Sequence, residues 1–225
     1  TFTGTNSNVT SGDNSYISGE FSGAPEGDFV IADDGKNLTI PEGTTFTVTD
    51  SLGLNGQVLI VKGTLVIDNR ASVYGTGATG EGILIVGKGS IQNNGTIGKT
   101  MGVSIYYDKN DNGAIDAGTD PYITMQGVSG VSFSTVKNGE NTDFAVTGNV
   151  TTTSGAKANT LTIKGAVITG DFTTAKKVTL VLGSDVTVAK NAAVAFNGNV
   201  DGGRNIIVSE GASVSVNGAL AGTVK

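Results

Sequence analysis

One short segment of this chain has the residue types and the spacing of a calcium-binding loop. Asp108, Asn110 and Asn112 stand at alternate positions, Gly113 follows directly, and Ala114 comes next. Alternate residues of a tight loop can turn their side-chain oxygens toward one centre, and the glycine permits the sharp turn. Ala114 would offer its backbone carbonyl. Because carboxylate, amide and carbonyl oxygens are the ligands that Ca²⁺ prefers, the spacing predicts a calcium site.

Residues 108–120 resemble the EF-hand-like calcium loops of bacterial and archaeal surface proteins, in which D-x-N-x-[DN]-G-x-x-D-x-G-[DE] lies between β-strands. The resemblance adds Asp116 as a ligand and also covers Gly118. At the twelfth position this chain has Thr119, and the expected carboxylate comes one residue later, at Asp120. The implied site is therefore weak, with an affinity in the roughly millimolar range of extracellular modules. The alternative is an Asx-rich hairpin loop without an ion, between strands expected at Ile105–Tyr107 and Tyr122–Met125.

The elements around this loop follow a strand-turn-strand phrase that recurs along the chain, at residues 38–48, 59–67, 83–91, 180–188 and 206–216. Each copy has an aliphatic or β-branched run, a turn with Gly or Asp, and a second alternating run. One such phrase cannot bury its apolar face alone, but stacked copies can. No window shows sustained helical periodicity. We expect an all-β fold of stacked β-arches, either an irregular β-solenoid or a sandwich-like repeat, with a calcium-loop hairpin insert and almost no helix.

Composition along the chain divides it into four regions. We expect an extended N-terminal arm at 1–27, a first β repeat region at 28–100, a hairpin insert with the calcium-type loop at 101–127, and a second β repeat region at 128–225, all in one continuous structural unit. The arm is acidic and could tie one subunit to another, or it could be a floppy terminus. The chain opens on Thr1 rather than Met, which is expected of a mature protein whose leader has been removed and equally of a trimmed chain.

Composition also excludes whole classes of function. The chain has no His and no Cys, which excludes Ser-His-Asp and Cys-His catalysis, disulfides and the usual zinc or copper ligands. Its net charge of −6 makes nucleic-acid binding unfavourable. No apolar stretch approaches the roughly 20 residues that span a bilayer.

The absence of His and Cys does not exclude glycosidases, because their chemistry needs only carboxylates, but the sequence gives little support for one. Asp33 and Asp34 lie in an acidic turn, and the chain has no Trp to form a sugar platform. A polysaccharide lyase would need basic residues in a groove, and the candidates Lys176, Lys177 and Arg204 are more simply surface charges. We therefore expect no enzyme. Asn-X-Ser/Thr sequons stand at Asn8, Asn37, Asn94 and Asn149, where glycans and unmodified turn asparagines are both open.

The Gly-, Thr-, Val- and Asn-rich β phrases, the absence of Cys, the few aromatics and the calcium-type loop resemble self-assembling surface proteins. The family we name is the amyloid-like cell-sheath and surface-layer proteins of archaea, methanogen sheath proteins in particular. Parallel β-helix adhesins of bacteria share the same rhythm of strands. The first resemblance implies stacked β-arches, edge-to-edge pairing of subunits and a purely mechanical role at the cell surface.

Open sheet edges give a physical basis for self-assembly, since two repetitive β halves that do not close present at least two of them. Val58–Ile67 and Val178–Val188 carry few charges, and we expect them to pair between subunits. The sequence thus predicts an extracellular structural protein that binds copies of itself through strand edges and builds a sheath, surface layer or filament. The alternative is a monomeric β-helix adhesin or binding module of a larger cell-surface protein.

Overall fold

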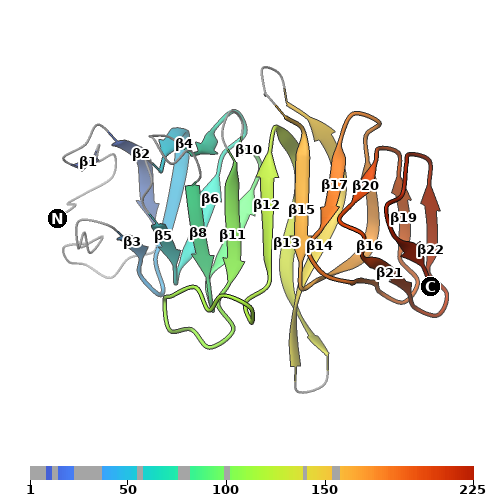
Figure 1. Ribbon diagram of the computed structural model, residues 1–225. Helices are drawn as coiled ribbons and strands as arrows, with labels where there is room; N and C mark the ends of the chain where they lie inside the picture. The colour runs from blue at the N-terminus through green and yellow to red at the C-terminus, as the bar shows by residue number, and fades with distance from the viewer. Residues whose placement is uncertain are drawn as a thin grey trace. The chain divides into compact units, whose positions relative to one another are not determined.

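The structure is a computed structural model that describes residues 9–11, 15–22, 37–54, 58–75, 82–98, 102–138, 141–153 and 158–225. All regular elements in these ranges are β-strands (Figure 1), which confirms the predicted all-β class. Accordingly, no helix there is long and apolar enough to cross a membrane. The chain divides into two compact units, Thr1–Asp116 and Ala117–Lys225, and the boundary lies within the predicted insert.

The first unit is a stack of parallel strands in two sheets. One sheet has the order β3 (Asn37–Ile40), β5 (Val58–Val61), β8 (Gly82–Val86), β11 (Val103–Tyr107). In the other sheet, β4 (Thr45–Gly53) pairs with β6 (Thr64–Ile67) and β7 (Ser72–Tyr74), which continue to β9 (Ser90–Asn93) and β10 (Thr96–Ile97). The predicted N-terminal arm is described only as β1 (Val9–Ser11) and β2 (Ser15–Ser22). These two strands pair antiparallel with each other, and β2 also pairs antiparallel with β4.

Stacking in register builds the core of this unit. Leu59, Leu84 and Ile105 are cross-strand partners in successive parallel strands, and each is at most 2% exposed. The turns lead from one sheet into the other: Gly87–Gly89 joins β8 to β9, which pair with different neighbours. At Gly89, a Cβ atom would collide with the carbonyl oxygens of Val61 and Gly63 in the turn below. Of the two architectures predicted, the stacked-arch solenoid is therefore the correct one.

The second unit has the same design. One sheet contains β12 (Tyr122–Gln126), β15 (Thr160–Lys164), β17 (Thr179–Leu182) and β20 (Val200–Asp201), of which β12 is antiparallel to β15. The other contains β13 (Val128–Asn138), β14 (Asn141–Thr152), β16 (Ala166–Thr174), β18 (Val186–Val188), β21 (Asn205–Val208) and β23 (Thr223–Val224). On its third side, β19 (Ala193–Phe196) stacks on the end of β16, and β22 (Ser213–Val216) stacks on β19.

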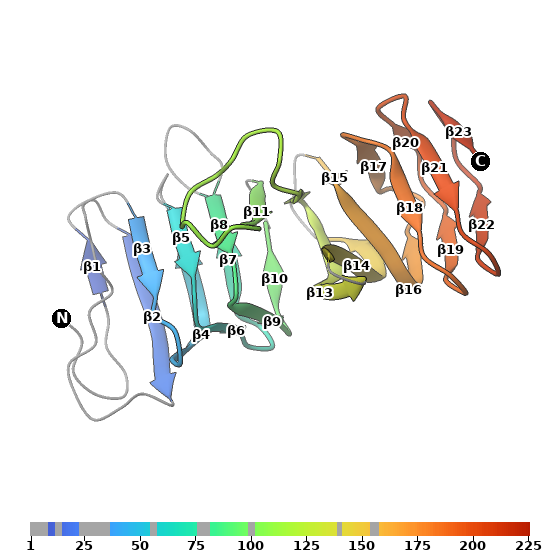
Figure 2. The same ribbon diagram turned by 90° about the horizontal axis from the view of Figure 1, so that it is seen from below.

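The turns of the second unit are more regular than those of the first. Leu180 pairs with Val200, Val186 with Ile206, and Val194 with Val214, always 20 residues apart. In the first unit, Leu59 pairs with Leu84, 25 residues apart. Figure 2 shows these short strands following one another as stacked layers within each unit.

The two segments predicted to pair between subunits lie inside these stacks, so that prediction is wrong. β5 lies between β3 and β8, and β6 between β4 and β9. In the second unit, β17 lies between β15 and β20, and β18 between β16 and β21. Their low charge therefore reflects positions where both edges are already hydrogen-bonded within the chain. By contrast, β22 pairs only with β19 in the part of the chain that the structure describes.

Candidate functional site: a calcium-type loop

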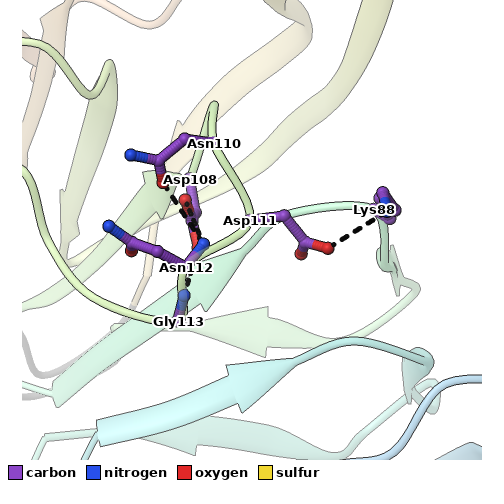
Figure 3. Close-up of polar contacts among 6 residues, drawn as sticks. All are labelled: Lys88, Asp108, Asn110, Asp111, Asn112 and Gly113. Atoms are coloured by element: carbon purple, nitrogen blue, oxygen red, sulfur yellow. Dashed lines mark hydrogen bonds and ion pairs between the residues drawn. The ribbon is translucent and has the colours of Figure 1, made fainter.

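The calcium-type loop begins where β11 ends. The backbone N–H of Asp108 continues the parallel ladder by donating to the carbonyl of Val86 at 2.9 Å, and the residue is 3% exposed. Its carboxylate accepts hydrogen bonds from the backbone N–H groups of Asn112 (3.3 Å) and Gly113 (2.7 Å), as Figure 3 shows. Gly113 adopts φ +76°, which glycine tolerates without strain. Asp108 thus fixes a tight turn around its own side chain.

Four of the six predicted ligands come together in this turn. One oxygen of Asp116 accepts hydrogen bonds from the side-chain amides of Asn110 (2.7 Å) and Asn112 (3.2 Å). The Asn110 side-chain oxygen in turn accepts from the backbone N–H of Asn112 at 3.2 Å. The loop therefore gathers two carboxylates and two amides from residues 108–116.

The donor set fits a hard cation. All of its side chains offer oxygen, and rotating an asparagine amide by half a turn exchanges its nitrogen for its oxygen. Asn110 and Asn112 could thereby turn oxygen toward the position that their amides now present to Asp116. Among the described residues, no three His, Cys, Asp or Glu side chains form a metal-binding group, so a cation here depends on amide and backbone oxygens as well. Such a site suits Ca²⁺ at modest affinity.

The remaining two predicted ligands, Ala114 and Asp120, differ from each other in their position. Ala114 donates its backbone N–H to the side-chain oxygen of Asn112 at 2.8 Å, so it belongs to the same turn. Asp120 belongs to the second unit, where it is 5% exposed. Thr119, at the twelfth loop position, is exposed. The roles of the Ala114 carbonyl and of Asp120 as ligands stay predictions.

A contact that sequence reasoning missed anchors the loop to the first unit. Asp111 points away from the other loop side chains toward Lys88 in the β8–β9 turn, and the carboxylate oxygen lies 3.4 Å from the ammonium nitrogen (Figure 3). In the same turn, the Asp111 carboxylate lies against the backbone of Gly87, where a side chain would displace it. Farther along, Gly113 lies against the side chain of Ile60 in β5, 3.8 Å from an ideal Cβ position. The loop therefore packs on the outer face of the first unit.

The seat of the loop is an apolar outer face. Strand alternation directs Leu84 and Val86 into the core and Ile85 outward, yet Ile85 is only 3% exposed. The loop passes over the neighbouring ends of β5 and β8, as Figures 1 and 2 both show. A signal for this cover was present in the sequence: Ile83–Val86 is a continuous apolar run, which is typical of strands buried on both faces.

The glycosylation sequons are placed as follows. Asn94 is exposed in the turn after β9. Asn149 is exposed in β14, where its side-chain oxygen accepts a hydrogen bond from the Thr173 hydroxyl at 2.8 Å. Asn37 begins β3, and Asn8 lies outside the described residues.

Comparison with known proteins adds no relative. No protein-family model, no curated protein and no solved structure matches this chain. Function must therefore be inferred from its own residues and fold.

Proposed function

We propose that this chain is an extracellular structural protein that assembles with copies of itself through strand edges into a sheath, surface layer or filament. The observation that carries the proposal is the last turn of the second unit. Val214 and Val216 of β22 are half-buried, whereas their partners one turn earlier, Val194 and Phe196, are 4% and 0% exposed. Among the described strands, none stacks on β22 to cover these inward-facing side chains.

The residues of this turn do nothing to discourage pairing. From Gly211 to Val224 the chain has no charged residue and no proline. Natural proteins usually protect an open strand edge with charge, proline, a bulge or a covering segment. An unprotected edge beside half-buried valines favours strand addition from another molecule, and a monomer that kept it open would be prone to aggregation.

Calcium binding is part of the proposal. Asp108, Asn110, Asn112 and Asp116 would hold Ca²⁺ with the help of the Ala114 carbonyl, and the ion would supply charge that fixes the loop on the outer face of the first unit. Its role would be mechanical, because the loop lies against Ile60, the cross-strand partner of the buried Ile85. A surface location outside the cell fits the low affinity expected of two carboxylates, because extracellular calcium modules work at about millimolar levels.

The proposal is tested by negative-stain electron microscopy and sedimentation velocity on purified protein, in millimolar calcium and in excess chelator. We expect ordered filaments, tubes or sheets and a concentration-dependent increase in sedimentation coefficient. Weaker assembly in chelator would show that the calcium-type loop contributes to self-assembly. Monodisperse particles at all concentrations would reject self-assembly.

A second candidate, an adhesin module of a larger surface protein, is favoured by one feature of the first unit. A surface hollow of about 290 Å³ lies along three stacked turns, lined by Glu42, Lys62, Lys88 and the hydroxyl residues Thr45, Thr64 and Ser90, among others. Hydroxyl and ammonium groups suit an acidic saccharide. Binding of such a saccharide by monodisperse protein, lost in Lys62→Ala, would favour this candidate over assembly.

Glycans at the exposed Asn94 and Asn149 would be compatible with either candidate. Intact mass of protein isolated from its natural source tests for them, and it tests the extracellular location at the same time.

A further inference from the structure

The dipeptide Asn-Gly occurs six times in the chain, at Asn55, Asn94, Asn112, Asn138, Asn197 and Asn217. Such a pair can modify itself, because glycine has no side chain to keep its backbone nitrogen away from the carbon of the neighbouring side-chain amide. Both residues of the pair are described by the structure at Asn94, Asn112, Asn197 and Asn217. The pair in the calcium-type loop has different surroundings from the other three.

Those three pairs are held between stacked turns. Asn94, Asn197 and Asn217 each donate their backbone N–H to a carbonyl of the preceding turn, at 2.8–3.2 Å. The glycine after each of them lies directly against a backbone carbonyl of the neighbouring turn, where a Cβ atom would collide with it. The peptide bond between asparagine and glycine therefore has little room to rotate.

The Asn112–Gly113 pair lies in the loop instead of the stack. An ideal Cβ position at Gly113 is 3.8 Å from the nearest described atom, Cδ1 of Ile60. The backbone N–H of Asn112 donates to the side chains of Asp108 and Asn110 rather than to a strand. Asn112 is exposed, so water reaches it. This peptide bond has the space to turn toward the Asn112 side chain.

The loop also places polar groups at each atom that would react. The backbone N–H of Gly113 donates to the Asp108 carboxylate at 2.7 Å, a distance at which that carboxylate can accept the proton. The side-chain oxygen of Asn112, where negative charge would develop, accepts a hydrogen bond from the Ala114 N–H at 2.8 Å. The amide nitrogen of Asn112, which would leave, donates to Asp116 at 3.2 Å.

We infer that Asn112 is a self-modification site, at which the loop converts its own amide into a carboxylate. The Gly113 nitrogen attacks Cγ of Asn112, and the new N–Cγ bond closes a succinimide ring. The Cγ–Nδ2 bond breaks, and ammonia leaves with the proton that the Gly113 nitrogen has lost. Water then opens the ring, at Cγ to give aspartate or at the main-chain carbonyl carbon to give isoaspartate. Water is the sole co-reactant, and nothing is oxidised or reduced.

The product changes the donor set of the calcium-type loop. Asp108 and Asp116 would be joined by a third carboxylate at residue 112, and calcium affinity depends on the number of charged ligands. Without an ion, the new carboxylate would repel that of Asp116, which the Asn112 amide now contacts. Modification therefore makes the loop more dependent on calcium. This consequence rests on the calcium binding in the proposed function, whereas the modification itself does not.

Incubation of the folded protein in heavy-oxygen water, followed by digestion in ordinary water and peptide mass spectrometry, compares the four pairs in one sample. Each ring opened during incubation gains a heavy oxygen, which distinguishes it from modification during digestion. We expect Asn112 to react about tenfold or more faster than Asn94, Asn197 and Asn217, because open space and a carboxylate contact occur together at Gly113. In urea, where these contacts are lost, the four rates should become similar.

Equal or slower reaction of Asn112 in the folded protein would overturn the inference, because its hydrogen bonds would then hold the turn closed. Asn112→Gln is the matched control: it keeps an amide, but the longer side chain would have to close a larger ring. The product at residue 112 should disappear in this variant, while the other three pairs react as before. Circular dichroism should show the variant folded.

The Asn112→Asp variant carries the aspartate product in every molecule and tests the consequence for calcium. In calcium titrations followed by thermal unfolding, it should bind calcium severalfold more tightly than freshly prepared wild type. If Asn112 reacts fastest but calcium stabilises neither protein, the self-modification stands and the calcium binding in the proposed function is rejected. If calcium stabilises both proteins but Asn112 does not react fastest, calcium binding stands and the self-modification is rejected.

Discussion

The two units stabilise the outside of the same kind of solenoid in different ways. In the first unit, outward positions of β5 and β8 are apolar, the calcium-type loop lies against Ile60, and Ile85 is only 3% exposed. In the second unit, outward positions are mainly polar and are half-buried or exposed. There, equivalent residues of successive turns hydrogen-bond to each other along the stack.

These polar columns follow the regular spacing of the second unit. The Asn217 side chain donates to that of Asn197 at 2.8 Å, 20 residues away. Asn205 donates to Asp185 through both its side chain and its backbone, and accepts from the Thr223 hydroxyl at 2.7 Å. Pairing in register keeps equivalent positions of successive turns aligned, so short side chains can reach each other.

The comparison shows two ways to stabilise the outer face of a solenoid: turns of equal length, or a loop that covers the face. Where turns are equal in length, side-chain columns stabilise the surface locally, and no further segment is needed. Where they are unequal, as between Leu59 and Leu84, the strands still pair in register, but the outward partners Ile60 and Ile85 are apolar and an inserted loop lies over this face. We therefore expect mutations on the outer face to be costly in the first unit and tolerated in the second.

The largest expected effect comes from placing a threonine on each of the two outer faces. Ile85→Thr puts a hydroxyl beneath the loop and removes buried apolar volume, and we expect it to lower the free energy of unfolding by about 2 kcal/mol. Val181→Thr, at an outward, half-buried position of β17, keeps the side-chain shape and should change it by less than about 0.5 kcal/mol. Urea denaturation of both variants measures the difference. Equal losses would show that the loop does not cover the face.

Calcium should raise the free energy of unfolding by a smaller amount. We expect this gain to depend on the loop carboxylates that face the turn. At a calcium concentration ten times the dissociation constant, one site stabilises the folded state by about 1.4 kcal/mol. Asp116→Asn should remove most of this gain, because Asp116 is the carboxylate that both asparagine amides contact. Calcium titrations followed by thermal unfolding measure it.

Asp111→Asn is the matched control for calcium. It removes one carboxylate from the same loop, but Asp111 points to Lys88, so calcium should still stabilise this variant. If both variants lose the calcium response equally, the general negative charge of the loop, rather than a defined site, would account for it.

Much of this architecture follows from local sequence, because in-register stacking needs only recurring aliphatic runs separated by turns. The strands around 38–48, 59–67 and 206–216 were predicted on that ground and are present. Which strands lie at an edge depends on the whole stack, and so the charge-poor runs at 58–67 and 178–188 were wrongly taken for edges. In the loop, the spacing of Asp108, Asn110 and Asn112 indicated the turn. The contacts of Asp111 with Lys88 and Gly87 join residues more than 20 positions apart, which spacing within the loop does not encode.

The smallest expected effect concerns pH and the polar column at Asp185. The Asn205 side-chain amide first, and then its backbone N–H, hold the pKa of the Asp185 carboxyl below its ordinary value of 3.8, with Lys225 and Arg204 adding to the shift. Because the folded pKa is lower than the unfolded one, the charged column stabilises the fold above about pH 4. This contribution is lost as the pH falls through the lowered value.

Asn205→Ala should raise the pKa of Asp185 toward 3.8 and weaken the acid dependence of stability in that range, as measured by NMR titration of the Asp185 carboxyl. Asn217→Ala is the control, because its amide contacts Asn197 in a different column, and it should leave that pKa in place. An unchanged pKa in Asn205→Ala would assign the shift to the backbone N–H of residue 205 and to Lys225 and Arg204 instead. The polar columns would then result from the regular turns without stabilising the outer face of the second unit.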